Sequence, residues 1–245
     1  MPSKLNEYED LIKKSLELGY THITIREYYH KLKENTLGSK KYFLHRHDID
    51  TDTKTAKKMF EIEKKYDVKT TSYFRLSTLD INLMKMIDSY GSEASYHFEE
   101  IATYCKSNHI KSKEKALEKI TDIRQLFINN VETVETKSGI KIRTVASHGD
   151  FVNRKLRIQN NEITKDIKLR NYLSLTCEAY DNDLQNSFDV YVKDGMYPKK
   201  YIPIIFDTLG KYNTICFLTH ARYWNIHILT NLQDSLKRAY EGLRW

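Results

Sequence analysis

Seven polar side chains stand at the ends of short apolar segments, although these segments are spread over most of the chain. They are Asp48, Asp50, Arg75, His97, His148, Glu178 and His220. In barrels and open sheets of parallel strands the active site lies at the carboxyl ends of the strands, so these side chains are expected to converge. Two aspartates beside three histidines are a donor set typical of metal-dependent hydrolases.

The segments that end in these residues read as strands, together with one that ends at Arg26. They are Thr21–Arg26, Lys41–Asp50, Val68–Arg75, Glu93–His97, Ile142–His148, Leu173–Glu178 and Ile215–His220. Helical periodicity predicts the helices Asn6–Leu18, Thr53–Tyr66, Asp80–Tyr90, Ser112–Asn129, Lys199–Tyr212 and Asn225–Leu243. Asp52 or Thr53 can cap the second of these helices, and Asp80 the third. Alternating strands and helices predict an α/β fold around a parallel sheet, as a seven-stranded or open barrel.

Length and charge limit the class of protein. A chain of 245 residues with 40% hydrophobic residues can bury one core, so residues 1–245 are expected to form a single domain. The net charge of +7 comes largely from lysines in helical runs at 54–65 and 111–119, where glutamates are interleaved. This pattern is typical of a solvated helix face. With no zinc-finger or RNP-type spacing, a nucleic-acid partner is not expected, although the charge can favour an anionic polymer or a membrane surface.

The chain carries no sequence signal for export or membrane insertion. The amino-terminal residues MPSKLNEYEDLIKKS have no apolar core, and no apolar run reaches 18 residues. The three cysteines, Cys105, Cys177 and Cys216, have no paired spacing and are expected to be free, buried thiols. These features predict a cytoplasmic protein without stable membrane insertion.

The segment Phe43–Asp50, FLHRHDID, is the most informative local motif. In an extended chain, alternation puts three side chains on one face and two on the other: Arg46, Asp48 and Asp50 against His45 and His47. Two adjacent carboxylates repel each other unless a cation or a shared proton intervenes, so a divalent metal beside a general base is expected there. The alternative is that Asp50 and Asp52 cap a helix while Asp48 pairs with Arg46.

Three later segments supply histidines. His97 ends EASYH, where an imidazole suits zinc, nickel or cobalt and Glu99 or Glu100 can hold its second nitrogen, although a lone histidine is more often structural. His148 precedes Gly149, which allows a close approach of backbone or ligand.

The last of these segments, CFLTHARYW, ends on aromatic residues that follow its histidine. His220 is followed closely by Arg222, Tyr223 and Trp224. An aromatic ring at a strand end can stack on a sugar, but a buried tryptophan is the commoner case.

Taken in order, the motifs HRHDID, SYFRLST, SYHFEE, Ser147–Gly149 (SHG) and LTHARYW resemble the polysaccharide deacetylase family, the NodB-homology domain of carbohydrate esterase family four. The resemblance is closest to the branch associated with capsule and surface-glycan genes, whose first motif reads His-Asp-Xaa-Asp. It runs from Glu9 to Trp224. The resemblance implies a distorted (β/α)7 barrel and metal-dependent removal of an acetyl group from a sugar.

The resemblance also implies roles for individual residues. Asp48 matches the family's general base, and Asp50 matches its metal-binding carboxylate. His97 matches the first histidine of the metal-binding His-Xaa-Xaa-Xaa-His motif, and His220 matches the histidine that protonates the leaving group. The implied cofactor is a divalent ion, with zinc expected and nickel, cobalt or manganese as alternatives.

Three positions depart from the family pattern. Ile101 stands where the second metal histidine is usual, and His148 is the obvious substitute. Ile49 separates two aspartates that are adjacent in many members, which leaves the roles of Asp48 and Asp50 interchangeable. Ala221 replaces a proline often found after the last histidine.

The function expected from these features is removal of an acetyl or similar acyl group from an amino sugar or glycan precursor. Asp50, His97 and His148 would hold the metal, and Asp48 and His220 would move protons. A further set is expected to bind the carbohydrate: Arg75, Glu178, Arg222 and Trp224. The alternatives are another carbon–nitrogen hydrolase, an inactive carbohydrate-binding protein and a partner-binding subunit of surface-polysaccharide assembly. The sequence does not set the oligomeric state.

Overall fold

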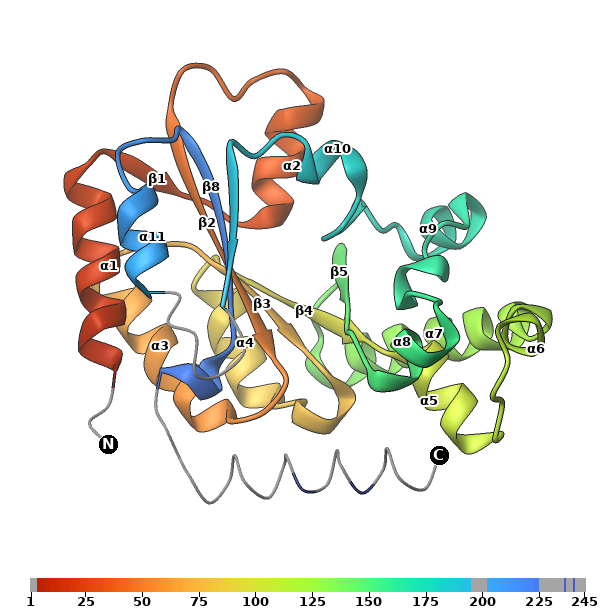
Figure 1. Cartoon of the computed structure of the whole chain (residues 1–245). Helices are drawn as coiled ribbons and strands as arrows, with labels where there is room; N and C mark the ends of the chain where they lie inside the picture. Colours follow the sequence, from red (N-terminus) through yellow and green to blue (C-terminus); the bar gives the residue numbers. More distant parts are fainter. Residues whose placement is uncertain (1–3, 195–201, 225–235, 237–239, 241–245) are drawn as a thin grey trace.

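The computed structural model of the chain describes residues 4–194, 202–224, 236 and 240 (Figure 1). Its centre is a curled, parallel sheet of eight strands in the order β6-β5-β4-β3-β2-β8-β7, with β1 paired to β2. The strands are β1 (Tyr20–His22), β2 (Lys41–Ile49), β3 (Thr71–Phe74), β4 (Glu93–Phe98), β5 (Thr144–Ser147), β6 (Cys177–Glu178), β7 (Val190–Lys193) and β8 (Thr214–Thr219). In the described part of the chain β6 and β7 do not pair, so the sheet forms a half-barrel. This is the predicted α/β class, a distorted (β/α)7 fold.

Strand β2 pairs with three other strands of the sheet. β1 pairs with its first residues, Lys41–Phe43, and β3 pairs with its last, Arg46–Ile49, while β8 lies along its other side. Every residue of β2 after Lys41 is buried. The carboxyl end of β2 therefore lies between the ends of β3 and β8, at the centre of one rim of the sheet.

Helices surround the sheet on both faces (Figure 1). They are α1 (Leu5–Glu17), α2 (Ile25–Lys33), α3 (Thr53–Lys65), α4 (Ile81–Ser89), α5 (Glu100–Ser107), α6 (Lys113–Glu118), α7 (Ile120–Ser138), α8 (Phe151–Leu156), α9 (Ile167–Leu173), α10 (Asn182–Gln185) and α11 (Ile202–Thr208). The short 3-10 turns are η1 (Leu76–Thr78), η2 (Asn160–Glu162) and η3 (Ala221–Tyr223). Among the described residues, none of these helices combines the length and the apolar character needed to cross a membrane.

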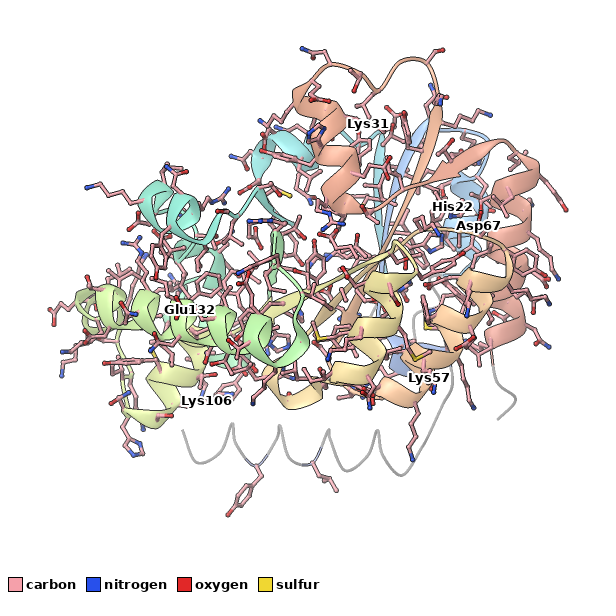
Figure 2. All side chains as sticks on the ribbon, turned by 180° about the vertical axis from the view of Figure 1, so that it is seen from behind. His22, Lys31, Lys57, Asp67, Lys106 and Glu132 are labelled. Atoms are coloured by element: carbon pink, nitrogen blue, oxygen red, sulfur yellow. The ribbon has the colours of Figure 1, made fainter. Side chains whose placement is uncertain are left out.

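Two predicted helix caps are confirmed. Asp52 accepts a hydrogen bond from the backbone N–H of Thr55 at 3.0 Å and begins α3, and Asp80 does the same for Leu83 at the start of α4. The exposed face of α3 carries the predicted lysines, and Figure 2 shows Lys57 pointing away from the protein. The three cysteines are buried, as expected.

Other element boundaries differ from the prediction. Residues Thr24–Arg26 were expected to extend the first strand, but Thr24 accepts a hydrogen bond from the Glu27 N–H and begins α2. Of the predicted strand Leu173–Glu178, the first residue ends α9 and only the last two pair with β5. Strand β7 was not predicted, although Val190–Val192 consists of residue types that favour strands.

The predicted helices differ from the structure in two places. The helix predicted at Ser112–Asn129 is two helices, α6 and α7, and α7 continues to Ser138. α11 covers residues 202–208 of the one predicted at Lys199–Tyr212. The helix predicted at Asn225–Leu243 lies outside the described residues, except for two isolated positions.

Candidate metal centre

Five of the predicted residues come together at the rim of the sheet. Asp48 belongs to the end of β2 and Asp50 follows it, while His97, His148 and His220 stand at or just after the ends of β4, β5 and β8. His97 Nε2 lies 3.4 Å from Asp48 Oδ2 and 3.4 Å from Asp50 Oδ1. The Oδ2 atom of Asp50 lies 3.3 Å from His148 Nε2 and 3.7 Å from His220 Nε2. The strand-end rule therefore predicted which distant segments meet.

Three of these residues have the donor atoms of a metal site. One ligand atom from each of Asp50, His97 and His148 lies within 4.8 Å of the others, and all three residues are buried. His97 Nδ1 is 2.8 Å from the carbonyl oxygen of Ala146, which can only accept, so Nδ1 carries the proton and Nε2 turns a lone pair toward the cluster. One carboxylate and two imidazoles fit a zinc-type ion with an open coordination position, so this cluster can hold a metal ion.

Asp48 has a different environment from Asp50. Its two oxygens accept hydrogen bonds from Arg46 Nε and Nη2, both at 2.9 Å, and both side chains are buried. The guanidinium lies 4.3 Å from the ring centre of Tyr180. Burial alone would raise the pKa of Asp48, but the charge of Arg46 lowers it below its ordinary value. Asp48 is therefore an ionised acceptor near neutral pH.

The structural alternative for FLHRHDID holds in part. Asp48 pairs with Arg46, and Asp52 caps α3. Asp50 does not cap that helix and instead faces His97 and His148. The two carboxylates of the motif thus share His97 as a neighbour, but Asp48 is bonded to Arg46 and Asp50 faces His148.

His220 is held by a carboxylate that the sequence did not reveal. Its Nδ1 atom lies 2.9 Å from Asp194 Oδ1, and its backbone N–H donates to Asp194 Oδ2 at 2.7 Å. Burial lowers the pKa of His220, but Asp194, with Asp50 and Asp48 nearby, raises it overall to about 9. Asp194 directly follows β7, so the sequence signal for it was the short apolar run Val190–Val192, which Lys193 and then this acid follow.

His148 faces the carboxylate that was expected to serve His97. Glu99 Oε2 lies 3.4 Å from His148 Nδ1, and Arg75 holds Glu99 through hydrogen bonds of 2.7–3.0 Å. Glu100 instead contacts Tyr96 and Asn130. The expectation that Glu99 or Glu100 holds His97 is therefore wrong, because the Ala146 carbonyl occupies that position.

The electrostatics around His148 favour its protonated form in the metal-free protein. Burial lowers the pKa of His148, but the contact with Asp50, supported by Glu99, raises it overall to about 9. A bound cation would replace this proton, since a metal ligand is the neutral imidazole.

Three of the four residues expected to contact substrate make contacts inside the protein. Arg75 is bonded to Glu99. The two oxygens of Glu178 accept the backbone N–H groups of Ser147 and Tyr180, each at 2.8 Å, and burial raises its pKa to about 7. Trp224 is fully buried and its indole N–H donates to Thr219 at 2.8 Å, which favours the buried alternative for this residue. The Arg222 guanidinium is half-buried and lies 5.8 Å from the Tyr223 ring centre.

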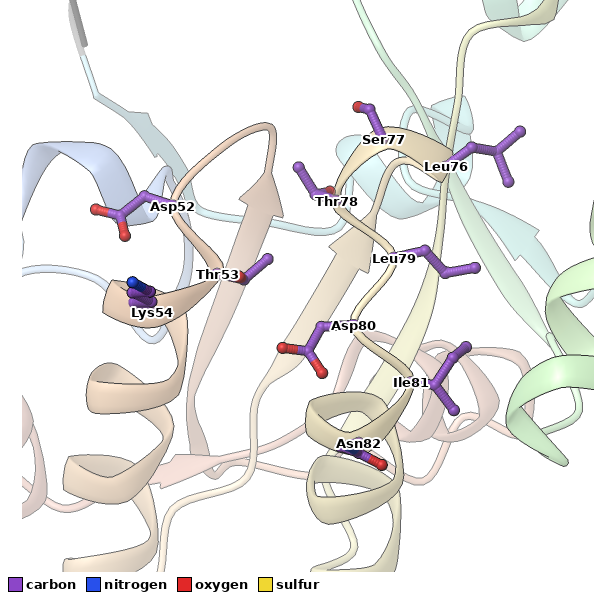
Figure 3. A pocket seen from close by; sticks show the side chains of 10 residues that line it. All are labelled: Asp52, Thr53, Lys54, Leu76, Ser77, Thr78, Leu79, Asp80, Ile81 and Asn82. Atoms are coloured by element: carbon purple, nitrogen blue, oxygen red, sulfur yellow. The ribbon is translucent and has the colours of Figure 1, made fainter. Parts of the chain in front are cut away.

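A cavity of about 710 Å³ has ten lining residues, and none of the five cluster residues is among them (Figure 3). The loops after β2 and β3 form its walls, starting two residues after Asp50 and one residue after Arg75. Its lining mixes polar and apolar side chains, among them Lys54, Asp80, Asn82, Leu76 and Leu79. This composition suits a ligand with hydroxyl groups and apolar faces, such as a sugar.

The face of β2 that points away from Asp48 carries a second, buried polar cluster. The Tyr8 hydroxyl donates to Glu63 at 2.7 Å, and His47 Nε2 lies 2.8 Å from the same carboxylate. The rings of His22 and His45 stack with their centres 5.0 Å apart. His45 and His47 therefore point away from the metal cluster, as alternation predicted.

Comparison with known proteins gives a similarity of fold only. No protein-family model matches the chain, and no curated protein matches it. A CE4 family pseudoenzyme from Bacillus anthracis, in a mutant with restored enzymatic activity, has 16% identity and a TM-score of 0.49 over 82% of this chain and 64% of that one. A Streptococcus pyogenes deacetylase in complex with acetate has 16% identity and a TM-score of 0.43, over 61% and 66%. The Bacillus subtilis peptidoglycan deacetylase PdaC has 12% identity and a TM-score of 0.30, over 84% and 98%. The chain spans just under two thirds of the first two proteins.

Proposed function

We propose that the protein is a metal-dependent hydrolase that removes an acetyl or similar acyl group from an amino sugar or glycan precursor in surface-polysaccharide metabolism. The observation that carries this proposal is the Asp50–His97–His148 cluster, which has an ionised carboxylate on one side and a carboxylate-backed histidine on the other. The ordered motifs that resemble polysaccharide deacetylases support the substrate class. In this proposal the metal is zinc, and nickel, cobalt and manganese are alternatives.

The three cluster residues would hold the ion through Asp50, His97 Nε2 and His148 Nε2. A divalent ion bound there polarises an acyl carbonyl and makes water more acidic. Asp48 accepts the proton of the attacking water, because Arg46 keeps this carboxylate ionised and fixes its orientation.

His220 is the proton donor of the proposed reaction. The contact with the Asp194 carboxylate favours the protonated imidazole, which can deliver a proton to the leaving amine nitrogen. Asp194 keeps its Nδ1 atom engaged at 2.9 Å, so the ring presents Nε2 toward Asp50 and the cluster. In this proposal Asp48 is the proton acceptor and His220 the proton donor, the two roles that acyl transfer by an acid and a base requires.

Substrate recognition is assigned to the cavity and to Arg222. The cavity provides both hydroxyl-binding groups and apolar walls on the loops that follow β2 and β3. In this proposal Arg75 and Glu178 act through Glu99 and the backbone of Ser147, and Trp224 supports the loop that carries His220.

A second candidate function is carbohydrate binding without turnover. The observation that favours it is Ile101, which occupies the usual position of a metal histidine and is 1% exposed in the hydrophobic core. Bound metal distinguishes the two functions, because only the hydrolase requires it.

The test combines elemental analysis with a panel of acetylated amino sugars. Protein purified without chelator or histidine tag should contain one transition-metal ion and release acetate. Asp50→Asn should lose metal and turnover together, since an amide is a poorer, uncharged ligand. Asp48→Asn should keep the metal and lose about 10²- to 10⁴-fold in rate.

Asp10→Asn, on the exposed surface, is the matched control and should behave like the parent. Loss of metal in Asp48→Asn with retention in Asp50→Asn would reverse the two roles. A parent protein that binds no metal and releases no acetate would refute the hydrolase.

A further inference from the structure

His148 comes from a loop, but its backbone is fixed at both polar groups. β5 ends at Ser147, so His148 is outside regular structure. Its N–H donates to the carbonyl of Phe98 at 2.8 Å, and its carbonyl accepts from Asn160 Nδ2 at 2.6 Å. The preceding N–H, of Ser147, donates to Glu178 at 2.8 Å. A loop residue bonded in this way loses most of the backbone freedom that loops usually have.

Asn160 uses its whole amide group in this arrangement. Its Nδ2 atom donates to the His148 carbonyl and to Asn153 Oδ1 at 3.1 Å, and its Oδ1 atom accepts from the backbone N–H of Ile101 at 3.0 Å. The residue is 1% exposed. A single buried side chain thus ties the His148 loop to the first turn of α5, where Ile101 stands instead of the usual second histidine.

The ring of His148 has a support of its own. Its Nδ1 atom faces Glu99 Oε2 at 3.4 Å, while three hydrogen bonds from Arg75 hold the Glu99 carboxylate. With Nδ1 turned to Glu99, Nε2 is presented to Asp50 at 3.3 Å. A carboxylate on the far nitrogen is the usual way in which proteins orient a metal-binding histidine.

We propose that Asn160 and the Arg75–Glu99 pair are positioning residues that make His148 the third metal ligand of this chain. This inference rests on the proposed function, since it requires that the cluster binds a cation. Asn160 fixes where the loop places the imidazole, and Glu99 fixes which nitrogen points at the ion. The affinity of the site then depends on residues that do not touch the metal, because a ligand on an unsupported loop must be ordered at each binding event.

The first test replaces Asn160 with aspartate. This variant keeps the size of the side chain and the acceptor for the Ile101 N–H, but it removes both N–H donors, including the one to His148. Competition with a chelator should show Zn²⁺ affinity lower by about 10- to 100-fold. The added negative charge by itself would strengthen cation binding, so a loss has to come from positioning.

The control is Asn108→Asp, on the exposed end of α5. Asn108 Nδ2 donates to the Tyr104 carbonyl at 2.9 Å, so the same kind of bond is lost far from the cluster. Its Zn²⁺ affinity should equal that of the parent.

A spectroscopic readout separates positioning from general stability. In the Co²⁺-loaded protein, the visible absorption bands of Asn160→Asp should move toward those of His148→Ala, whereas a merely structural role lowers the melting temperature and leaves the bands unchanged. Glu99→Gln removes the negative charge that faces His148 Nδ1 and should shift the same bands. Because Glu99 is partly exposed, Glu99→Gln tests the positioning of the His148 ring if Asn160→Asp does not fold.

The outcomes distinguish this inference from the proposed function. A parent protein that binds neither Zn²⁺ nor Co²⁺ refutes the metal site and the inference with it. A parent that binds both ions, with parental affinity and bands in Asn160→Asp and Glu99→Gln, refutes the positioning roles and leaves the hydrolase standing.

Discussion

Replacing Arg46 with methionine should destabilise the metal-free protein by about 3–5 kcal/mol, because it leaves the Asp48 carboxylate buried without its counter-charge. The side chains of Arg46 and Asp48 are 1% and 3% exposed, so solvent screens their interaction little. For charge centres about 4 Å apart and an effective dielectric constant of about 20, the attraction is about 4 kcal/mol. Methionine replaces much of the volume of the arginine, so the loss reports the charge more than a cavity.

A double-mutant cycle isolates the pair. Asp48→Asn leaves the guanidinium buried, but the ring of Tyr180 at 4.3 Å still stabilises the cation, so this loss should be smaller than that of Arg46→Met. The double variant removes both charges and should be more stable than Arg46→Met alone, as often happens when a buried ion pair is replaced as a whole.

The measurement is urea unfolding of the four proteins at neutral pH with chelator present, followed by far-ultraviolet circular dichroism. Lys65→Met, at the exposed pair with Glu9, is the control and should remain close to the parent. If the stability losses of the two single variants add up to the loss of the double variant to within about 0.5 kcal/mol, the two charges are not coupled. Arg46 would then not be the group that keeps Asp48 ionised.

Three further predictions concern other parts of the chain. Ile101→His should not restore Zn²⁺ binding to His148→Ala, because Ile101 is buried in the hydrophobic core; chelator competition would show recovery if this is wrong. Asp194→Asn should keep the metal and lower turnover of the best acetylated amino sugar, since Asp194 contacts His220 and is not one of the three cluster residues. The contribution of His22 to stability should fall by about 3 kcal/mol between pH 6.5 and pH 4, because burial lowers its pKa from 6.5 to about 4 and the unfolded chain binds more protons at this group. Glu178, whose pKa burial raises to about 7, contributes in the opposite direction, so the measurement is a comparison by urea unfolding: the parent should lose about 3 kcal/mol relative to His22→Gln across this window.

The strand-end residues were predictable because the parallel sheet determines where strand ends meet. β2, β4, β5 and β8 run in the same direction, so Asp50, His97, His148 and His220 reach the same rim despite separations of tens of residues. Alternation within β2 also predicted that His45 and His47 face away from the cluster. These inferences needed only strand direction and the period of the side chains.

The supporting residues could not be predicted in the same way. Asp194 closely follows the apolar run Val190–Val192, so the strand-end rule could have placed it at the rim, but nothing in its neighbourhood identifies His220, 26 residues later, as its partner. Asn160 stands in a short 3-10 turn and contacts the loop after β5 and the first turn of α5, two segments that the sequence does not bring together. Such contacts depend on the packing of loops against one another, and a single sequence contains no period that reports it.

Two explanations of Ile101 predict different surroundings for this residue and for His148. In the first, the metal site has been lost; in the second, His148 takes over as the ligand. If a ligand had only been lost, nothing would require the histidine on the β5 loop to be held in place, and its imidazole could turn away from Asp50. Instead, His148 is buried, bonded at both backbone groups and directed at Asp50, and the Asn160 amide bonds both to its carbonyl and to the Ile101 N–H. Burying an imidazole between two carboxylates costs free energy unless the site provides a proton or a cation to balance the charge. In the metal-free protein the proton on His148 provides this balance, and in the relocated-ligand proposal a bound cation replaces that proton at a position held by residues from one loop, one turn and one helix end.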